Sequence, residues 1–291
     1  MPADTSDYEA ELDAIFETLA ELAPEIRASL PGRRVKSDET NPSGETRVEA
    51  DAYADELIEE ALGDIDGVGT YASEEQAEPI DVGDGNISIA CDPLDGSSNI
   101  KPNSPMGTII AVYEGDLPAG GDRLLASGFV LFGPILTMTY ARDGQVTEAN
   151  VGDGEIDVID DDVTLPEEPT VYSMGGRVPD WTPGFSAFIR AVEQEYKLRY
   201  GGAMVADVNQ VITYGGIFSY PALKSAENGK LRLQFEGIPI AYIIESAGGA
   251  SSDGAKSILD VEPTEFHQRV PVHLGNDELI DRLEATLAAH D

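Results

Sequence analysis

One short stretch constrains the fold most: an apolar run over residues 87–91 that ends in two aspartates and a turn of small residues. The stretch reads Asp92-Pro93-Leu94-Asp95-Gly96-Ser97-Ser98-Asn99. The apolar run predicts a buried strand, and Pro93 stiffens the backbone so that both aspartates can point into one cavity. Carboxylates in this number suit a hard cation such as Mg²⁺ or Mn²⁺. The small residues after them let backbone N–H groups approach an anion, so the stretch indicates chemistry on a phosphate.

A second acidic pair, Glu74-Glu75, follows another β-like run over residues 69–72. Strand ends direct their side chains into shared crevices, and acids gathered there without a cation would repel one another strongly. We therefore favour metal binding over a surface role for these two glutamates and the two aspartates.

The charge of the chain is unusual, because 55 Asp and Glu face 18 Lys and Arg, which gives a formal net charge of −37. Such self-repulsion destabilises the compact state at low salt, whereas at 1 M salt the Debye length shrinks to about 3 Å. The acids are spread along the chain rather than gathered in an acidic tail, so we predict a protein adapted to a salt-saturated cytoplasm, as in a halophile. This charge argues against partners such as nucleic acid or an anionic membrane.

Three further features place the chain among cytoplasmic proteins. Cys91 is the single cysteine, so no intrachain disulfide is expected. The N-terminus lacks the basic and apolar regions of a signal peptide. The longest apolar stretch, residues 124–140, is interrupted by glycine and proline and is too short to span a bilayer.

The hydrophobic pattern predicts an α/β chain of two domains, 1–165 and 166–291, divided at an acidic, proline-bearing stretch. Asp143-Gly144 lies between two β segments and indicates a hairpin turn. A polar loop is expected over residues 35–46. Helices are expected at residues 7–30, 51–62, 183–193, 203–213, 236–247 and 276–289, the last capped by Asn276.

Taken together, the two acidic pairs resemble class I fructose-1,6-bisphosphatases, a branch of the metal-dependent, lithium-sensitive phosphatases to which inositol monophosphatases also belong. A second set of blocks, at residues 199–208, 214–221 and 228–236, resembles the sugar-bisphosphate site of that branch, and His267-Gln268-Arg269 fits its C-terminal region. The resemblance covers residue 51 to the end. It implies the sugar phosphatase fold, a layered α-β-α-β-α sandwich of two domains with the site between them.

The resemblance also implies a role for individual residues. Asp51 and Glu75 would orient and deprotonate the attacking water, and Glu45 falls where the family has an aspartate on a loop that closes over the third metal. The implied ligands of two to three Mg²⁺ or Mn²⁺ ions are Glu74, Asp92, Asp95, Glu236 and the carbonyl of Leu94. The implied substrate-binding residues are Gly96, Ser97, Ser98, Asn99, Arg199, Tyr200, Met204, Tyr220, Lys230 and Arg232.

Some of these roles have support from residue chemistry alone. Lys230 is one of six lysines, and its neighbour Arg232 shares the block, so a site for an anion is indicated. The alternative for both is that they balance nearby acids. Tyr200 and Tyr220 need hydrogen-bond partners if buried, which phosphate oxygens supply; the alternative is aromatic packing in the core. His267 and His273 are assigned no role.

Two departures from the family pattern stand out. Gly175 sits where the family has an asparagine that helps to hold the 6-phosphate. Residues 6–30 lack the family's threonine-rich AMP segment, and Asn86-Ile87 replace a lysine–tyrosine pair that contacts AMP. Inhibition by AMP is therefore not expected.

The resemblance implies hydrolysis of fructose 1,6-bisphosphate to fructose 6-phosphate and phosphate in gluconeogenesis. It implies a homo-oligomer, a dimer or a tetramer, in which Arg199 serves the site of a neighbouring subunit. One alternative is the same chemistry on sedoheptulose 1,7-bisphosphate or an inositol phosphate. Another class, a non-catalytic acidic cation-binding protein, is disfavoured because such a protein needs no water-activating pair.

Overall fold

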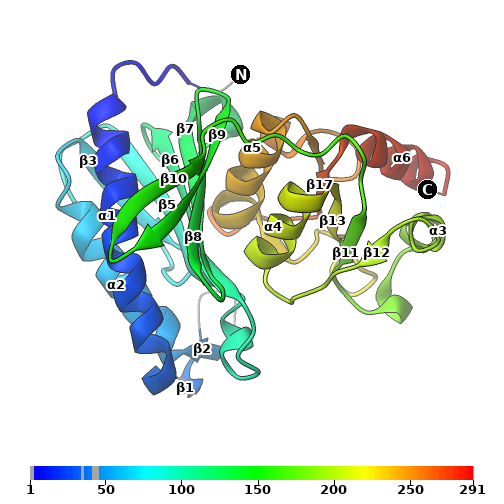
Figure 1. Cartoon of the computed structure of the whole chain (residues 1–291), viewed down its shortest axis with the longest axis horizontal. Helices are drawn as coiled ribbons and strands as arrows, with labels where there is room; N and C mark the ends of the chain where they lie inside the picture. Colours follow the sequence, from blue (N-terminus) through cyan, green and yellow to red (C-terminus); the bar gives the residue numbers. More distant parts are fainter. Residues whose placement is uncertain (1–2, 34–35, 41–45, 291) are drawn as a thin grey trace.

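The computed structural model describes residues 3–33, 36–40 and 46–290, and these form five alternating layers of helix and sheet (Figure 1). α1 and α2 cover one face of an eight-stranded sheet, α4 and α5 lie between that sheet and a five-stranded one, and α3 and α6 cover the far face. The expected α-β-α-β-α sandwich is therefore confirmed. The helices are α1 (Glu9–Ser29), α2 (Glu49–Gly63), α3 (Pro183–Val192), α4 (Met204–Tyr214), α5 (Ile238–Ser246) and α6 (Asp277–Ala288).

The first sheet carries both acidic pairs. Its strands are, in spatial order, β10 (Glu155–Asp160), β9 (Gln145–Gly152), β8 (Leu136–Arg142), β7 (Leu124–Phe132), β6 (Met106–Glu114), β5 (Ile87–Asp95), β3 (Val68–Ser73) and β4 (Ile80–Asp81). β3 and β5 run parallel, and the other neighbours are antiparallel. The predicted hairpin turn at Asp143-Gly144 joins β8 to β9, with φ of 52° and 73°. Such positive φ values are those of a tight hairpin turn.

The second sheet lies in the C-terminal half. Its strands are, in spatial order, β12 (Lys197–Leu198), β11 (Val171–Met174), β13 (Gly216–Tyr220), β17 (Val272–Gly275) and β15 (Ala250–Ser252). Two small ribbons complete the described part: β1 (Lys36–Thr40) with β2 (Thr46–Val48), and β14 (Leu231–Arg232) with β16 (Arg269–Val270). A single π-helical turn, Leu233–Gly237, leads from β14 into α5.

Two local expectations were wrong. The loop predicted over residues 35–46 contains strand β1, because these residues find a partner in β2; Glu45 lies outside the described residues. Asn276 precedes α6, but its side chain does not cap the helix. The Oδ1 atom of Asn276 instead accepts from Gly216 N at 2.7 Å, which ties the start of α6 to β13.

The hydrophobic core crosses the middle of the molecule. One buried cluster combines residues of the first sheet, such as Ile109 and Phe129, with Val208 of α4 and Ile243 of α5. The stretch between β10 and β11 contains the domain division expected at residue 165, which stays a prediction. None of the described helices has the length and hydropathy to cross a membrane.

Candidate active site

Two acidic pairs meet at the carboxyl ends of the neighbouring strands β3 and β5, a place that we call the acidic edge. Because β3 and β5 are parallel neighbours with Ser73 opposite Cys91, Glu74, the first residue after β3, lies beside Asp92, which is still part of β5. The Glu74 N–H donates to the carbonyl of Cys91 at 3.0 Å, which holds the backbone of Glu74 against β5. Ligand oxygens of Glu74, Asp92 and Glu236 all lie within 4.8 Å of one another. Three carboxylates so close together have the donor chemistry of a hard-cation site.

Glu236 reaches this cluster from the other half of the chain. It lies in the π-helical turn Leu233–Gly237 and is almost fully buried. Its Oε2 accepts from the backbone N–H of Arg232 at 2.6 Å. The guanidinium of Arg232, itself buried, pairs with Glu74 at 2.6 Å. Arg232 therefore balances a nearby acid, which is the alternative to anion binding that the sequence left open for it.

A cavity of about 300 Å³ unites most of the residues expected at the site. It is lined by Asp51, Glu74, Glu75, Asp92, Leu94, Asp95, Gly96, Ser97, Ser98, Tyr220, Lys230, Leu231, Arg232 and Glu236. Most of the acids come from the first sheet and α2, whereas Glu236, Lys230 and Tyr220 come from the second half. Leu231 is the one lining residue that the sequence did not single out.

The turn after Asp95 joins the acidic edge to α4. The Oδ2 atom of Asp95 accepts from Val205 N at 2.7 Å, in the first turn of that helix. Gly96 has φ of 75°, a left-handed conformation that suits glycine. A Cβ there would lie 2.3 Å from the Cβ of Ala203, so the close approach of the two segments also requires glycine. The turn then presents Ser97 and Ser98 toward the cavity.

Burial and mutual repulsion make the ionised carboxylates of the cluster costly unless a cation is bound. Burial, followed by repulsion from Glu74, raises the pKa of both Asp92 and Glu236 well above their ordinary values. Burial raises the pKa of Asp95 to about 7, against the bonds from the N-terminus of α4. A bound divalent ion would relieve this cost, since it favours the ionised form of every carboxylate near it. The residues present therefore fit a Mg²⁺ or Mn²⁺ site.

These shifts predict a pH dependence of stability for the metal-free protein. A carboxyl whose pKa is raised by folding binds more protons in the folded than in the unfolded state, so the free energy of unfolding falls as pH rises toward and through 7. In 3 M KCl without divalent ions we expect the melting temperature to drop between pH 5 and pH 8, by about 2–4 °C per kcal/mol lost. Saturating Mg²⁺ should flatten the dependence. An equal drop in melting temperature with and without Mg²⁺ would show that acids outside this cluster cause the pH dependence.

Four expected substrate residues lie outside the lining of this cavity: Asn99, Arg199, Tyr200 and Met204. Asn99 is buried, and its Nδ2 donates to the carbonyls of Gly201 and Pro105, both at 2.8 Å. Met204 is buried in the core. Tyr200 is 52% exposed, and burial together with nearby Tyr220 raises the pKa of its phenol.

Gly175 has a packing reason to be glycine. A Cβ at this position would lie 2.4 Å from Cδ2 of Tyr220, so the tyrosine ring fills the space that a side chain would need. The carbonyl of Gly175 accepts from the indole of Trp181 at 2.9 Å. The departure from the family asparagine thus accompanies a particular placement of the Tyr220 ring beside the cavity.

Asp207 is a residue of the site region that the sequence analysis did not predict. This residue of α4 is buried, and its carboxylate accepts from Gly201 N at 2.6 Å and from Gly202 N at 3.4 Å. Burial raises its pKa to about 6. Asp207 therefore fixes the loop that carries Arg199 and Tyr200. The signal was present, because an acid three residues after Met204 falls on the apolar face of a helix.

Asn86 and Ile87, where the resemblance implies a departure from an AMP-contacting pair, lie at a corner of the first sheet. Ile87 is buried in β5, and Asn86 Nδ2 donates to Tyr8 Oη at 3.2 Å. Tyr8 in turn donates to the carboxylate of Glu114 at 2.7 Å. A carboxylate and a filled hydrogen-bond network at this corner do not suit a nucleotide phosphate, although the absence of AMP inhibition stays a prediction.

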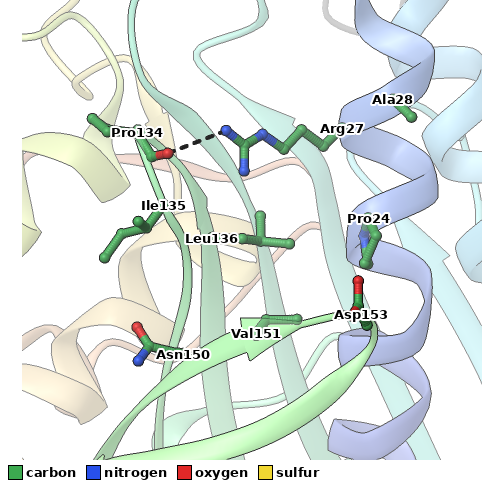
Figure 2. A pocket seen from close by; sticks show the side chains of 9 residues that line it. All are labelled: Pro24, Arg27, Ala28, Pro134, Ile135, Leu136, Asn150, Val151 and Asp153. Carbon is green, nitrogen blue, oxygen red and sulfur yellow. Dashed lines mark hydrogen bonds between the residues drawn. The ribbon is translucent and has the colours of Figure 1, made fainter.

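A larger cavity, of about 770 Å³, lies between α1 and strands β8 and β9 (Figure 2). Its lining is mainly apolar, with Ile135 63% exposed and Asp153 the one carboxylate among the lining residues. The guanidinium of Arg27 spans it and donates to the carbonyls of Gly133 and Pro134 at 3.1 and 3.4 Å. With no cluster of acids, this cavity lacks the means to hold divalent ions.

Comparisons with known proteins identify the family to which the chain is similar. Residues 4–155 match the family "Fructose-1-6-bisphosphatase, N-terminal domain", and residues 165–288 match the corresponding C-terminal domain. The chain is 56% identical to a class 1 fructose-1,6-bisphosphatase of Natronomonas pharaonis, over 95% of this chain and 98% of that protein. It is 53% identical to the one of Halobacterium salinarum, over 96% and 98%. The holo crystal structure of Leishmania major fructose-1,6-bisphosphatase superposes with a TM-score of 0.91 at 25% identity, over 97% of this chain and 96% of that one.

Proposed function

The chain belongs to the class I fructose-1,6-bisphosphatase family, and on that premise we propose that it hydrolyses fructose 1,6-bisphosphate to fructose 6-phosphate and inorganic phosphate, a step of gluconeogenesis. One observation carries the proposal: Glu74, Asp92 and Glu236 converge within 4.8 Å in the cavity that the Gly96-Ser97-Ser98 turn also lines. A cation cluster beside an anion-binding turn is the arrangement that phosphoryl transfer requires.

In this proposal the carboxylates Glu74, Asp92, Asp95 and Glu236, with the carbonyl of Leu94, hold Mg²⁺ or Mn²⁺. A bound ion lowers the pKa of its water and stabilises the leaving alkoxide. Asp51, in the first turn of α2, and Glu75 line the same cavity and would orient the water and accept its proton. Arg232 keeps Glu74 facing the cluster through their ion pair.

The two phosphates of the substrate would bind to different groups of the cavity lining. Backbone N–H groups of Gly96, Ser97 and Ser98 would hold the 1-phosphate. Lys230, whose side chain is exposed, and Tyr220 also line the cavity, and these would hold the 6-phosphate. The negative field of the acidic edge makes such cations necessary, because a bisphosphate would otherwise be repelled.

A panel assay tests this function. Purified protein in 3 M KCl with Mg²⁺ should release phosphate from fructose 1,6-bisphosphate with a kcat/KM at least about 100-fold above that for fructose 6-phosphate or an inositol monophosphate, since two phosphate contacts distinguish these substrates. Sedoheptulose 1,7-bisphosphate is the informative competitor because it keeps both phosphates. A higher kcat/KM for an inositol phosphate would contradict the proposal.

We further propose that the protein is a homo-oligomer in which Arg199 reaches the 6-phosphate of a neighbouring subunit. Arg199 is exposed, and it follows Leu198, a large apolar side chain that is 56% exposed. Arg199→Ala should raise KM by about 10-fold with little change in kcat, because the 6-phosphate is held alike in the ground and transition states. Light scattering at assay concentration must show more than one subunit. A fully active monomer would rule out the shared site.

A further inference from the structure

His267 connects the two acid-bearing segments of the cavity. Its Nε2 lies 2.8 Å from the carbonyl oxygen of Gln76, the residue that follows Glu75. Its ring also packs on Phe235, which precedes Glu236, with ring centroids 5.5 Å apart. One side chain from the C-terminal part thus contacts both the turn after β3 and the π-helical turn.

The contact to Gln76 determines which nitrogen of the His267 ring carries a proton. A carbonyl oxygen can only accept, so Nε2 must carry the proton. Burial lowers the pKa of His267, which favours the neutral ring, and Nδ1 is buried with no hydrogen-bond partner among the described residues. The imidazole is therefore a neutral donor directed at one backbone atom. A residue needed for packing alone would not require that donor.

The turn at Glu75 is held from both halves of the chain, and one link from the C-terminal half is the ion pair of Arg232 with Glu74. Within the N-terminal half, the Glu75 N–H donates to Ser73 Oγ at 3.1 Å, and Gln76 Nε2 donates to Glu59 of α2 at 2.6 Å. His267 adds a link from the other half to the backbone of this turn. Its neighbour Gln268 extends this link, because the carbonyl of Gln268 accepts from Leu233 N at 2.8 Å, at the start of the π-helical turn.

We propose that His267 is a positioning residue, whose Nε2–H bond to the Gln76 carbonyl fixes the Glu74-Glu75 turn relative to Glu236. The inference rests on the proposed function, since it concerns the geometry of that cation and water site. Without the bond the backbone after Glu75 loses a link to the other half that the Arg232–Glu74 ion pair, made by side chains, does not replace. The Glu75 backbone can then shift relative to Glu236, which weakens the cation site and misplaces Glu75 against the water.

Two variants of His267 separate positioning from packing. His267→Phe keeps an aromatic ring against Phe235 but removes the donor, whereas His267→Gln keeps an amide donor near the place of Nε2 and removes the ring. Positioning predicts that His267→Phe lowers kcat and Mn²⁺ affinity by about 10-fold each, with KM for the bisphosphate changed less than about 2-fold, as outer partners of metal ligands typically do. His267→Gln should recover most of both. A packing role predicts the reverse order.

The measurements include one that needs no turnover. Mn²⁺ binding by titration calorimetry and amide exchange of residues 74–78 are compared in 3 M KCl, with His290→Phe, at an exposed position, as the matched control. Faster exchange at residues 74–78 and weaker Mn²⁺ binding in His267→Phe support the inference. Wild-type values in His267→Phe overturn it. If His267→Phe melts far below the wild type, His267→Gln decides, because near wild-type Mn²⁺ affinity supports positioning and its loss refutes it. An inactive wild type would contradict the proposed function alone, since binding and exchange still test His267.

Discussion

Asp92→Asn should lower kcat by about three orders of magnitude or more, equivalent to about 4 kcal/mol of transition-state stabilisation. Asp92 belongs to the group of three carboxylates within 4.8 Å, and it lies in β5 beside Glu74. An amide in its place keeps the size and can still accept from Leu94 N, the bond that Asp92 Oδ1 makes at 3.1 Å. What is lost is the negative charge that would hold the cation over the phosphate.

Stability measurements distinguish this loss from unfolding. The pKa of Asp92 is raised by burial and by Glu74, so in the metal-free protein the ionised form is costly and an amide removes that cost. Metal-free Asp92→Asn should therefore melt no lower than the wild type. Asp84→Asn, on an exposed turn before β5, is the matched control and should keep full activity. Near wild-type turnover by Asp92→Asn at saturating Mg²⁺ would contradict the metal site.

The acidic edge was predictable from sequence because its determinants are local. An apolar run that ends in acids gives a buried strand with carboxylates at its end, and two such runs needed only to be parallel neighbours for Glu74 and Asp92 to meet. The structure has that pairing between β3 and β5. Turn chemistry was equally local, as Asp143-Gly144 and Gly96 show through their positive φ values.

The site residues contributed by the C-terminal half could not be predicted from local sequence patterns. Glu236 came from the family resemblance, because its approach depends on a π-helical turn and on the packing of two sheets around α4 and α5. Arg232 illustrates the same limit: sequence showed a cation in an anion-binding block, whereas its partner Glu74 lies 158 residues away in the chain. The contact of His267 is made with the backbone of Gln76, 191 residues away in the chain, which residue types do not reveal.

The surface of α1 illustrates why the stability of the fold should depend on salt. Asp13, Glu17, Glu21 and Glu25 are exposed at intervals of four residues, so they form one row of like charges along the helix. Neighbours in such a row lie about 5–6 Å apart, and each pair costs about 0.2–0.5 kcal/mol. Arg142 offsets Asp13 at 2.6 Å. With a net charge of −37, the chain repeats this repulsion over its whole surface.

We expect the melting temperature to rise by more than about 10 °C between 0.1 M and 3 M KCl, as measured by circular dichroism without divalent ions. The reason is screening: the Debye length is about 10 Å at 0.1 M, longer than the spacing of the row, and about 3 Å at 1 M, shorter than it. Sucrose strengthens burial without screening charge, so at matched osmolality it should recover much less. Glu17→Lys with Glu21→Lys breaks the row and should lower the KCl concentration needed for folding. Equal melting temperatures at 0.1 M and 3 M KCl would show that the acidic surface is tolerated without salt.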